Sequence, residues 1–312
     1  MALTSLPVLS LADDKASFSQ AIGESFRTFG FALVKDFDID RGLIDQAWQL
    51  SEQFFALPEA EKRSYHDPAI GGARGYTPFG VEIAKDAKHH DLKEFWHIGR
   101  DLPEGSPLAD ASMPPNVWPA RPDGFQDVFS ELYRQFDATG ATILSRIAVY
   151  LGLDEHWFDR GIEDGNSVMR LLHYPPLENV EGEAIRAGAH GDINLITLLL
   201  GAEEAGLELL GKDGSWINAS PPEGAMVINV GDMLERLTNN YLPSTIHRVR
   251  NPDATRAAFS RYSMPFFLHL RSDFPIRTLP QCVSAECPDR YPVAITADDF
   301  LQQRLREIGL KK

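Results

Sequence analysis

The sequence contains little cysteine, no long apolar run and too few positive charges to balance its negative ones. The only cysteines, Cys282 and Cys287, have no second pair or nearby histidine that would complete a zinc site. We interpret them as incidental thiols of a reducing compartment. The longest apolar stretch, 195–202, is too short to span a bilayer. A formal net charge of -15 repels nucleic acid and anionic membranes, so we expect neither as a partner.

The start of the chain also lacks positive charge. No Lys or Arg precedes Lys15, so the basic region of a signal peptide is missing, and we expect a cytoplasmic protein. The 312 residues, 43% of them hydrophobic, suffice for one large domain or two small ones with a sizeable core. The negative field does not exclude an acidic small-molecule substrate, because a local Arg can outweigh distant charge.

The first half alternates predicted helices with short strands. Phe18, Ile22 and Phe26 recur every four residues after a capping Asp13 or Asp14, which predicts a helix that stops at Gly30. We expect a buried strand at 31–34, helices at 40–55 and 125–151, and Gly- or Pro-rich loops at 66–80 and 101–123.

From about residue 165 the pattern changes to short β-rich runs separated by Gly, Pro and Asn. Many short strands with turn signals indicate a β-barrel or sandwich. Two helices are expected in this half, at 232–239 and 296–308. The strands are expected at 168–174, 195–200, 207–210, 215–218, 225–230, 244–250 and 257–268.

Two histidines and one aspartate in this β-rich half form a candidate metal site. His190 and Asp192 are two residues apart, and an extended chain would point both side chains to one face. His247 lies in an alternating strand that a barrel can bring alongside. Two imidazoles and one carboxylate are the ligand set of a non-haem Fe(II) site with open positions. The same spacing recurs at 89–91, but there in a charged stretch that we interpret as solvated.

A second polar pair follows the candidate ligands. Arg261 and Ser263 alternate with Tyr262 on a predicted strand, so both face one way. The Arg fork matches a carboxylate, and Ser adds one more donor. Apolar neighbours at 257–259 and 264–267 suggest a buried strand, where an Arg needs an anionic partner. Tyr174, at the end of an earlier strand, could donate to the same acid, although a structural role is equally plausible.

With these residues in view, the chain resembles the iron- and 2-oxoglutarate-dependent oxygenases of the isopenicillin N synthase-like group. The resemblance runs over nearly the whole chain. In the first half it is carried by the segments 28–33 (TFGFAL), 54–58 (FFALP) and 92–96 (LKEFW). In the second half it is carried by 173–176 (HYPP), 190–192 (HGD), 227–232 (VINVGD), 247–249 (HRV) and 261–263 (RYS).

The resemblance implies a mainly β fold with flanking helices and a double-stranded β-helix, or jelly roll, as its core. It implies one integrated unit, with an N-terminal helical and strand region over residues 1–120. Residues 121–312 would then hold the long helix, the jelly roll and the C-terminal helix. It also implies that His190, Asp192 and His247 hold Fe(II), and that Arg261 and Ser263 hold 2-oxoglutarate near Tyr174. Matching segments suggest Tyr76, Phe79, Glu82 and Phe95 as residues that line the substrate site.

The activity implied is a dioxygenase that oxidises, most often hydroxylates, a C–H bond of a small metabolite with O2. In that reaction 2-oxoglutarate becomes succinate and CO2. An oxidase of the same family could instead use O2 without 2-oxoglutarate, with Arg261 and Ser263 holding the substrate's own carboxylate. A zinc hydrolase shares the ligand types, and a binding protein without catalysis could keep the fold. The primary substrate and the oligomeric state cannot be derived from the sequence.

Overall fold

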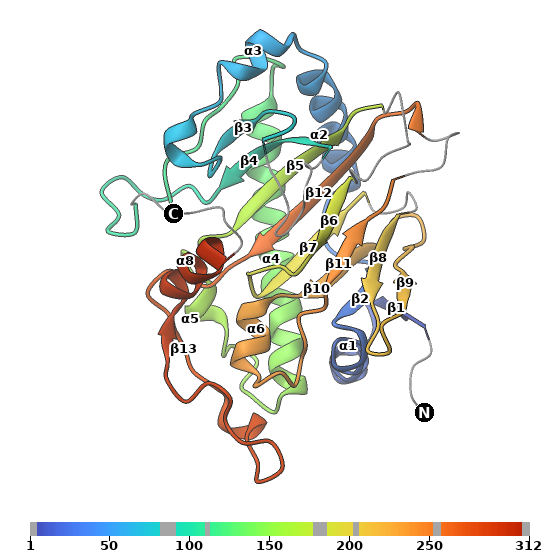
Figure 1. Ribbon diagram of the computed structural model, residues 1–312, viewed down its shortest axis with the longest axis vertical. Coiled ribbons are helices and arrows are strands. Elements are labelled where there is room, and N and C mark those ends of the chain that lie inside the picture. The colour runs from blue at the N-terminus through green and yellow to red at the C-terminus, as the bar shows by residue number, and fades with distance from the viewer. Residues whose placement is uncertain are drawn as a thin grey trace.

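The computed structural model describes residues 5–81, 92–109, 113–176, 186–201, 206–251 and 257–307. Two large sheets and a layer of helices dominate the part of the molecule that the structure describes (Figure 1). The larger sheet has eight strands in the order β1-β2-β10-β7-β12-β5-β4-β3. They are β1 (Val8–Ser10), β2 (Phe31–Lys35), β3 (Gly75–Thr77), β4 (Glu94–Gly99), β5 (Val168–Tyr174), β7 (Ile196–Leu200), β10 (Met226–Val230) and β12 (Arg261–Leu268).

The smaller sheet has the order β6-β11-β8-β9 and is antiparallel throughout. Its strands are β6 (Ala187–His190), β8 (Leu207–Leu210), β9 (Trp216–Asn218) and β11 (His247–Val249). From β5 to β12 the chain passes repeatedly between the two sheets, which is the winding of a double-stranded β-helix. The predicted mainly β fold with a jelly-roll core is therefore confirmed. A separate pair joins β13 (Pro275–Ile276) to β14 (Ile295–Thr296).

Helices cover the outer face of the larger sheet. The long helix α4 packs behind it, with α1 and α2 alongside (Figure 1). Within the described part of the chain, no helix is long and apolar enough to cross a membrane. The helices are α1 (Lys15–Phe29), α2 (Arg41–Phe55), α3 (Glu59–Arg63), α4 (Phe125–Tyr150), α5 (Asp159–Ile162), α6 (Asp232–Leu237) and α8 (Ala297–Glu307), with 3-10 turns at Pro68–Ile70 and Pro280–Cys282.

The boundaries of α1 follow from local chemistry. Asp14 caps the helix by accepting a hydrogen bond from the Ser17 backbone N–H at 3.0 Å. Gly30 ends it in the left-handed conformation, with φ 70°. A Cβ at Gly30 would lie 2.3 Å from Thr245 Oγ1, so the close approach of the chain also requires glycine.

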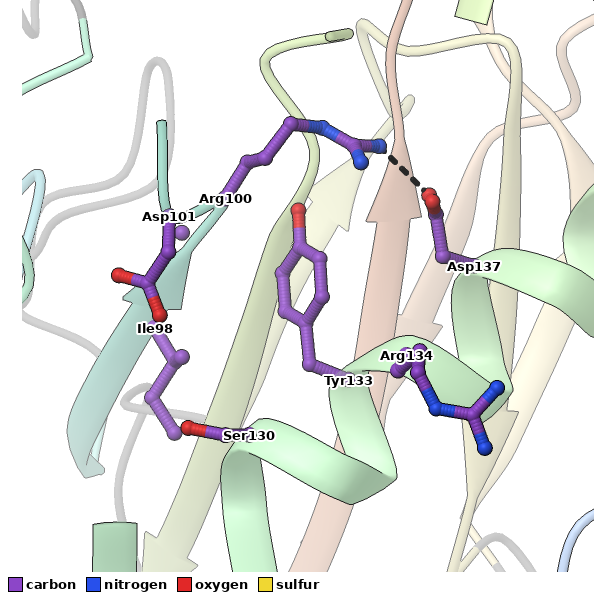
Figure 2. Close-up of a pocket in the computed structure, with 8 residues that line it drawn as sticks. Ile98, Arg100, Asp101, Ser130, Tyr133, Arg134 and Asp137 are labelled. Atoms are coloured by element: carbon purple, nitrogen blue, oxygen red, sulfur yellow. Dashed lines mark hydrogen bonds and ion pairs between the residues drawn. The ribbon is translucent and has the colours of Figure 1, made fainter. Parts of the chain in front are cut away.

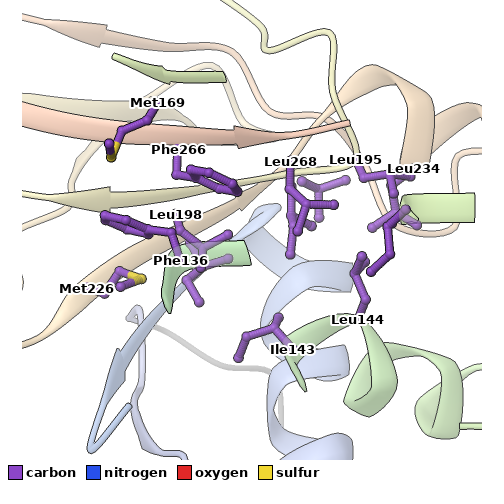
Figure 3. Packing of buried hydrophobic residues seen from close by; sticks show 14 of the residues in the cluster. Phe136, Ile143, Leu144, Met169, Leu195, Leu198, Met226, Leu234, Phe266 and Leu268 are labelled. Atoms are coloured by element: carbon purple, nitrogen blue, oxygen red, sulfur yellow. The ribbon is translucent and has the colours of Figure 1, made fainter. Parts of the chain in front are cut away.

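The main core lies between α4 and the larger sheet (Figure 3). Phe136 of α4 stacks on Phe266 of β12 with ring centroids 5.4 Å apart and planes within 5°. Leu198 and Leu268 complete this layer and are fully buried. Each such side chain contributes about 1.5–3 kcal/mol by leaving water. Because side chains alternate along a strand, fixing this face of β12 also fixes Arg261 and Ser263, which point the other way.

Three local predictions were wrong or incomplete. The loop expected at 66–80 contains β3, and β4 next to it was not predicted. The strand expected at 257–268 begins only at Arg261, and Phe259, predicted to be buried, is 63% exposed. The strand that carries His190 ends at that residue, so Asp192 lies just beyond it. The backbone carbonyl of Asp192 accepts a hydrogen bond from the Asp232 N–H at 2.7 Å instead of pairing within a strand.

Candidate metal and co-substrate site

The structure brings His190, Asp192 and His247 together. His190 ends β6 and His247 begins β11, and the two are direct register partners across this antiparallel pair. Partners in register place their side chains on the same face, and the two rings lie 4.5 Å apart. One candidate ligand atom from each of the three residues lies within 4.8 Å of the others. Strand pairing therefore produces a site that the sequence could show only as three separate residues.

Both imidazoles are oriented by backbone carbonyls. His190 Nδ1 donates to Gly188 O at 2.7 Å, and His247 Nδ1 donates to Thr245 O at 3.1 Å. A carbonyl only accepts, so Nδ1 carries the proton and the lone pair lies on Nε2. Each Nε2 is 3.9 Å from a different oxygen of Asp192. Two lone pairs and one carboxylate thus converge on one point, as a divalent metal requires.

Asp192 is held by neutral donors. Thr197 Oγ1 donates to Asp192 Oδ2 at 2.6 Å, and Asn229 Nδ2 donates to the same oxygen at 2.8 Å. Thr197 and Asn229 are register partners on β7 and β10. Burial alone would raise the pKa of Asp192, but His247, His190 and these hydrogen bonds outweigh it and lower the pKa. The carboxylate is therefore kept ionised as a ligand.

His190 is more accessible than its two partners. Its side chain is 41% exposed, against 6% for Asp192 and 9% for His247. The ring nevertheless lies within the fold, and this environment, together with the nearby His247, lowers the pKa of His190 to about 4. A neutral imidazole at neutral pH is the form that binds a metal. The site is thus open to solvent on its His190 side.

Arg261 lies at the start of β12 in the larger sheet, whereas the two histidines lie on the smaller sheet. It is 2% exposed, and among the described residues its Nε and Nη1 have no hydrogen-bond partner. A buried guanidinium without an acceptor is costly, so this position fits a carboxylate brought by a ligand. Ser263 is 4% exposed and lies on the same face of β12. Tyr174 pairs with Arg261 in register, and its ring centroid is 5.6 Å from the Arg261 Cζ.

The residues suggested as substrate lining lie in different environments. Tyr76 is fully buried, whereas Phe79 is 41% exposed. Phe95 packs with Leu172 and Tyr174 in a small cluster on the inner face of the sheet. Glu82 and the second H-x-D at 89–91 lie outside the described residues. The lining roles therefore stay predictions.

Sequence reasoning missed a buried polar network beside this site. Glu94, 4% exposed, accepts hydrogen bonds from Lys62 Nζ at 2.6 Å, His173 Nδ1 at 2.7 Å and the Tyr76 hydroxyl. His173 Nε2 is 2.9 Å from the hydroxyl of Ser260, which precedes Arg261. Burial would raise the pKa of Glu94, but the three donors lower it. Glu94 belongs to the segment 92–96, which carried part of the family resemblance but did not indicate the hydrogen-bond partners of this residue.

A hollow lies away from the candidate site, between the end of β4 and α4 (Figure 2). It has a volume of about 260 Å³, and none of the predicted site residues lines it. Arg100 reaches Asp137 there with a 2.7 Å ion pair, so its charge is compensated within the protein. Its lining residues are Ile98, Gly99, Arg100, Asp101, Ser130, Tyr133, Arg134 and Asp137. This hollow is therefore separate from the candidate site.

Known proteins match both halves of the chain. Residues 6–121 match the family described as non-haem dioxygenase in morphine synthesis N-terminal, and residues 165–270 match the 2OG-Fe(II) oxygenase superfamily. A 2-oxoglutarate-Fe(II) type oxidoreductase of Emericella nidulans is 32% identical, over 97% of this chain and 90% of that protein.

Solved structures of proteins from the same superfamily are also similar to this chain. A 2OG-Fe(II) oxygenase family protein from Caulobacter crescentus is 55% identical with a TM-score of 0.91, covering 98% of this chain and all of the other. A full-length protein of Neurospora crassa, solved in complex with alpha-KG, is 30% identical with a TM-score of 0.85. The match covers 96% of this chain and 95% of the Neurospora crassa chain. Another structure of that Neurospora crassa protein also contains thymine. With its fold and its His-Asp-His cluster, the chain belongs to the 2OG-Fe(II) oxygenase superfamily and is an oxidoreductase that depends on Fe(II) and 2-oxoglutarate.

Proposed function

We propose that His190, Asp192 and His247 bind the Fe(II), and that Arg261 with Ser263 binds the far carboxylate of 2-oxoglutarate beside Tyr174. The observation that carries this proposal is the convergence of the two Nε2 atoms and the Asp192 carboxylate within 4.8 Å. The unpartnered, buried nitrogens of Arg261 support the second half of the proposal.

We propose further that the enzyme hydroxylates a C–H bond of a small metabolite. With Fe(II), 2-oxoglutarate and O2 bound, the site supplies an oxidation that converts 2-oxoglutarate to succinate and CO2. The protein's own residues hold and orient the reactants. Arg261 fixes one end of the oxo acid, and Thr197 and Asn229 hold the ligand Asp192 in one orientation. Burial of Arg261 and Ser263 keeps water from competing for that carboxylate.

A small molecule is the substrate that the chain favours. The net charge of -15 disfavours nucleic acid and anionic membranes. The Neurospora crassa protein, which is similar over nearly its whole length, has been solved with thymine bound. We also propose that the enzyme acts in the cytoplasm, where a reducing environment preserves free thiols such as Cys282 and Cys287. Fractionation of cells that carry a tagged chain tests that location.

Iron-edge anomalous diffraction from crystals grown anaerobically with Fe(II) and 2-oxoglutarate tests the assignment. We expect one peak between His190 Nε2, His247 Nε2 and the Asp192 carboxylate, with 2-oxoglutarate density reaching Arg261. A peak at other residues, or an oxo acid that points away from Arg261, would contradict it. Once a substrate is known, mass analysis under labelled O2 tests hydroxylation. Gain of one oxygen atom is expected, whereas loss of two hydrogens would show desaturation.

A further inference from the structure

The strand β12 begins at the residue proposed to hold 2-oxoglutarate, and this end of the strand is paired along one edge. Strands β5 and β12 run side by side in the larger sheet, with Arg261 opposite Tyr174 (Figure 1). On the other edge, the described register partners of β12 on β7 begin at Met264. The backbone from Arg261 to Ser263 therefore pairs with β5 and not with β7, so its position depends on β5.

A side-chain hydrogen bond extends the hold of β5 beyond the strand. His173 of β5 is the register partner of Tyr262, and its Nε2 lies 2.9 Å from the hydroxyl oxygen of Ser260. A serine hydroxyl both donates and accepts, so it can bond to either protonation state of the imidazole. Because Ser260 immediately precedes Arg261 and lies outside β12, this bond fixes the chain on the N-terminal side of Arg261.

The His173 ring is itself held from several directions. Its side chain is 10% exposed, and its Nδ1 lies 2.7 Å from the Glu94 carboxylate. The rings of Tyr262 and Phe55 stack against it, with centroid distances of 4.8 Å and 5.2 Å. An imidazole that is bonded through both nitrogens and stacked on two rings has little freedom to turn. His173 is therefore a rigid support for Ser260.

This support belongs in part to the N-terminal region of the chain. Lys62 of α3 donates to the Glu94 carboxylate at 2.6 Å and to the Phe55 carbonyl, at the end of α2, at 3.2 Å. Glu94 lies on β4, which pairs with β5. The region before the jelly roll supplies none of the proposed iron ligands, but through these contacts it reaches the start of β12.

We infer that His173 is a positioning residue for 2-oxoglutarate, because its contacts with Ser260 and Tyr262 set the place of the Arg261 guanidinium. The inference rests on the proposed role of Arg261. Among the described residues, Nε and Nη1 of Arg261 have no hydrogen-bond partner, so the backbone that carries this side chain largely determines where these atoms lie. A small shift of that backbone misaligns the two-bond grip of a planar fork on a carboxylate.

Two oxo acids distinguish positioning from a general structural role. 2-Oxoglutarate and 2-oxopentanoate have the same chain length and the same keto-acid end, but the second lacks the far carboxylate. Anaerobic titration of the Fe(II)-loaded enzyme, followed by the visible charge-transfer band, gives a Kd for each. Wild type should bind 2-oxoglutarate at least about tenfold more tightly. Ser260→Ala should reduce this preference about two- to tenfold, as the loss of one hydrogen bond does, with the Kd of 2-oxopentanoate unchanged.

Further variants test the same contact. His173→Phe keeps a ring but removes both nitrogens, so it should reduce the preference at least as much as Ser260→Ala. Ser260→Thr keeps a hydroxyl and should retain the preference. In an Arg261→Ala background, Ser260→Ala should have no additional effect, because both changes act on one contact. Ser10→Ala is the matched control, since the Ser10 hydroxyl donates to Asp36 at 2.6 Å on the edge strand β1.

The outcomes separate failure of the inference from failure of the proposed function. The inference is overturned if the preference survives in both Ser260→Ala and His173→Phe, or if these variants weaken the binding of both oxo acids equally. A wild type that binds the two acids equally well counts against the Arg261 anchor itself, and the inference falls with it. Thermal unfolding reports whether each variant is folded. Ser260→Ala removes one half-buried hydroxyl, so it tests the inference even if His173→Phe does not fold.

Discussion

Thr197 Oγ1 donates a 2.6 Å hydrogen bond to Asp192 Oδ2, which joins β7 of the larger sheet to a residue two positions beyond the end of β6 in the smaller one. The hydroxyl is buried and also accepts a hydrogen bond from Asn194 Nδ2 at 3.0 Å. A carboxylate beyond the end of a strand needs such support, since no strand pairing fixes its position. Thr197 therefore orients the proposed iron ligand.

Thr197→Val should weaken Fe(II) binding. Valine keeps the shape but removes the hydroxyl, and loss of a group that orients a metal ligand costs about 10–100-fold in affinity. Anaerobic Fe(II) titration measures the change. Thr142→Val is the control, because the Thr142 hydroxyl bonds to the Ala138 carbonyl on an exposed part of α4. Equal affinity in the Thr197 variant and wild type would show that Asp192 is held without it.

Asp192→Ala should abolish stoichiometric iron binding, because it removes the only anionic group of the proposed ligand set. We expect iron content after anaerobic loading and desalting to fall at least about tenfold. Asp159→Ala provides a matched His–Asp control, since Asp159 is 2.9 Å from His156 on an exposed surface. Iron content that falls in the control and not in Asp192→Ala would contradict the assignment.

The candidate site was largely predictable because its chemistry is local in sequence. The pair His190 and Asp192, and the pair Arg261 and Ser263, each stand two residues apart, a spacing that an alternating chain places on one face. What could not be predicted was the alignment of His190 with His247, because strand register depends on long-range pairing. The end of β6 before Asp192 was missed for the same reason.

The buried pair Glu94 and Lys62 should be essential for stability. Glu94→Gln removes the buried carboxylate beside the Lys62 ammonium, which is 7% exposed, and breaking a buried pair costs about 3–5 kcal/mol. The double variant Lys62→Met/Glu94→Gln should lose less free energy of unfolding than the two single variants lose in sum. Urea unfolding measures each. Glu59→Gln is the control, because Glu59 is half-exposed and 3.5 Å from the same Lys62, and such a contact contributes about 1 kcal/mol or less.

The contribution of Glu94 to stability should be lost at acidic pH. Its pKa in the folded protein is lowered from the ordinary 4.5 by its donors. The stabilisation is therefore fully present above pH 4.5 and is lost as pH falls through the lowered folded value. The stability difference between wild type and Glu94→Gln should be constant near neutral pH and shrink in acid below the ordinary pKa of a glutamate. A difference that grows in acid would contradict the lowered pKa.

Gly140→Ala should destabilise the protein although it improves helix propensity. Alanine gains about 1 kcal/mol over glycine inside a helix. Here the added Cβ would lie 2.2 Å from Leu268 Cδ1, in the core between α4 and β12. Overpacking of this kind costs about 1–3 kcal/mol. Gly140→Ala/Leu268→Val should unfold at a higher denaturant concentration than expected from the two single changes. If Gly140→Ala alone stabilises the protein, the side chains of this core can shift to make room for the added methyl group.

The fold was predictable where a periodic pattern met a clear stop signal, as in α1 with Asp14 and Gly30. It was not predictable at β3 and β4. Gly75 and its glycine-rich neighbours signal a loop, and the strand character of Glu94 is hidden by its charge. In the folded protein, Lys62, Tyr76 and His173 provide buried partners for Glu94. Those partners come from three distant segments, which no local pattern reveals.

The most direct test of the account is anaerobic titration of the Fe(II)-loaded enzyme with 2-oxoglutarate, following the visible charge-transfer band. Wild type should develop the band, and Arg261→Ala should need at least about tenfold more 2-oxoglutarate, since a charge-assisted hydrogen bond contributes about 1.5–3 kcal/mol. No band in the wild type despite bound iron, or equal affinity in Arg261→Ala, would contradict the proposal that Arg261 anchors 2-oxoglutarate at this iron site.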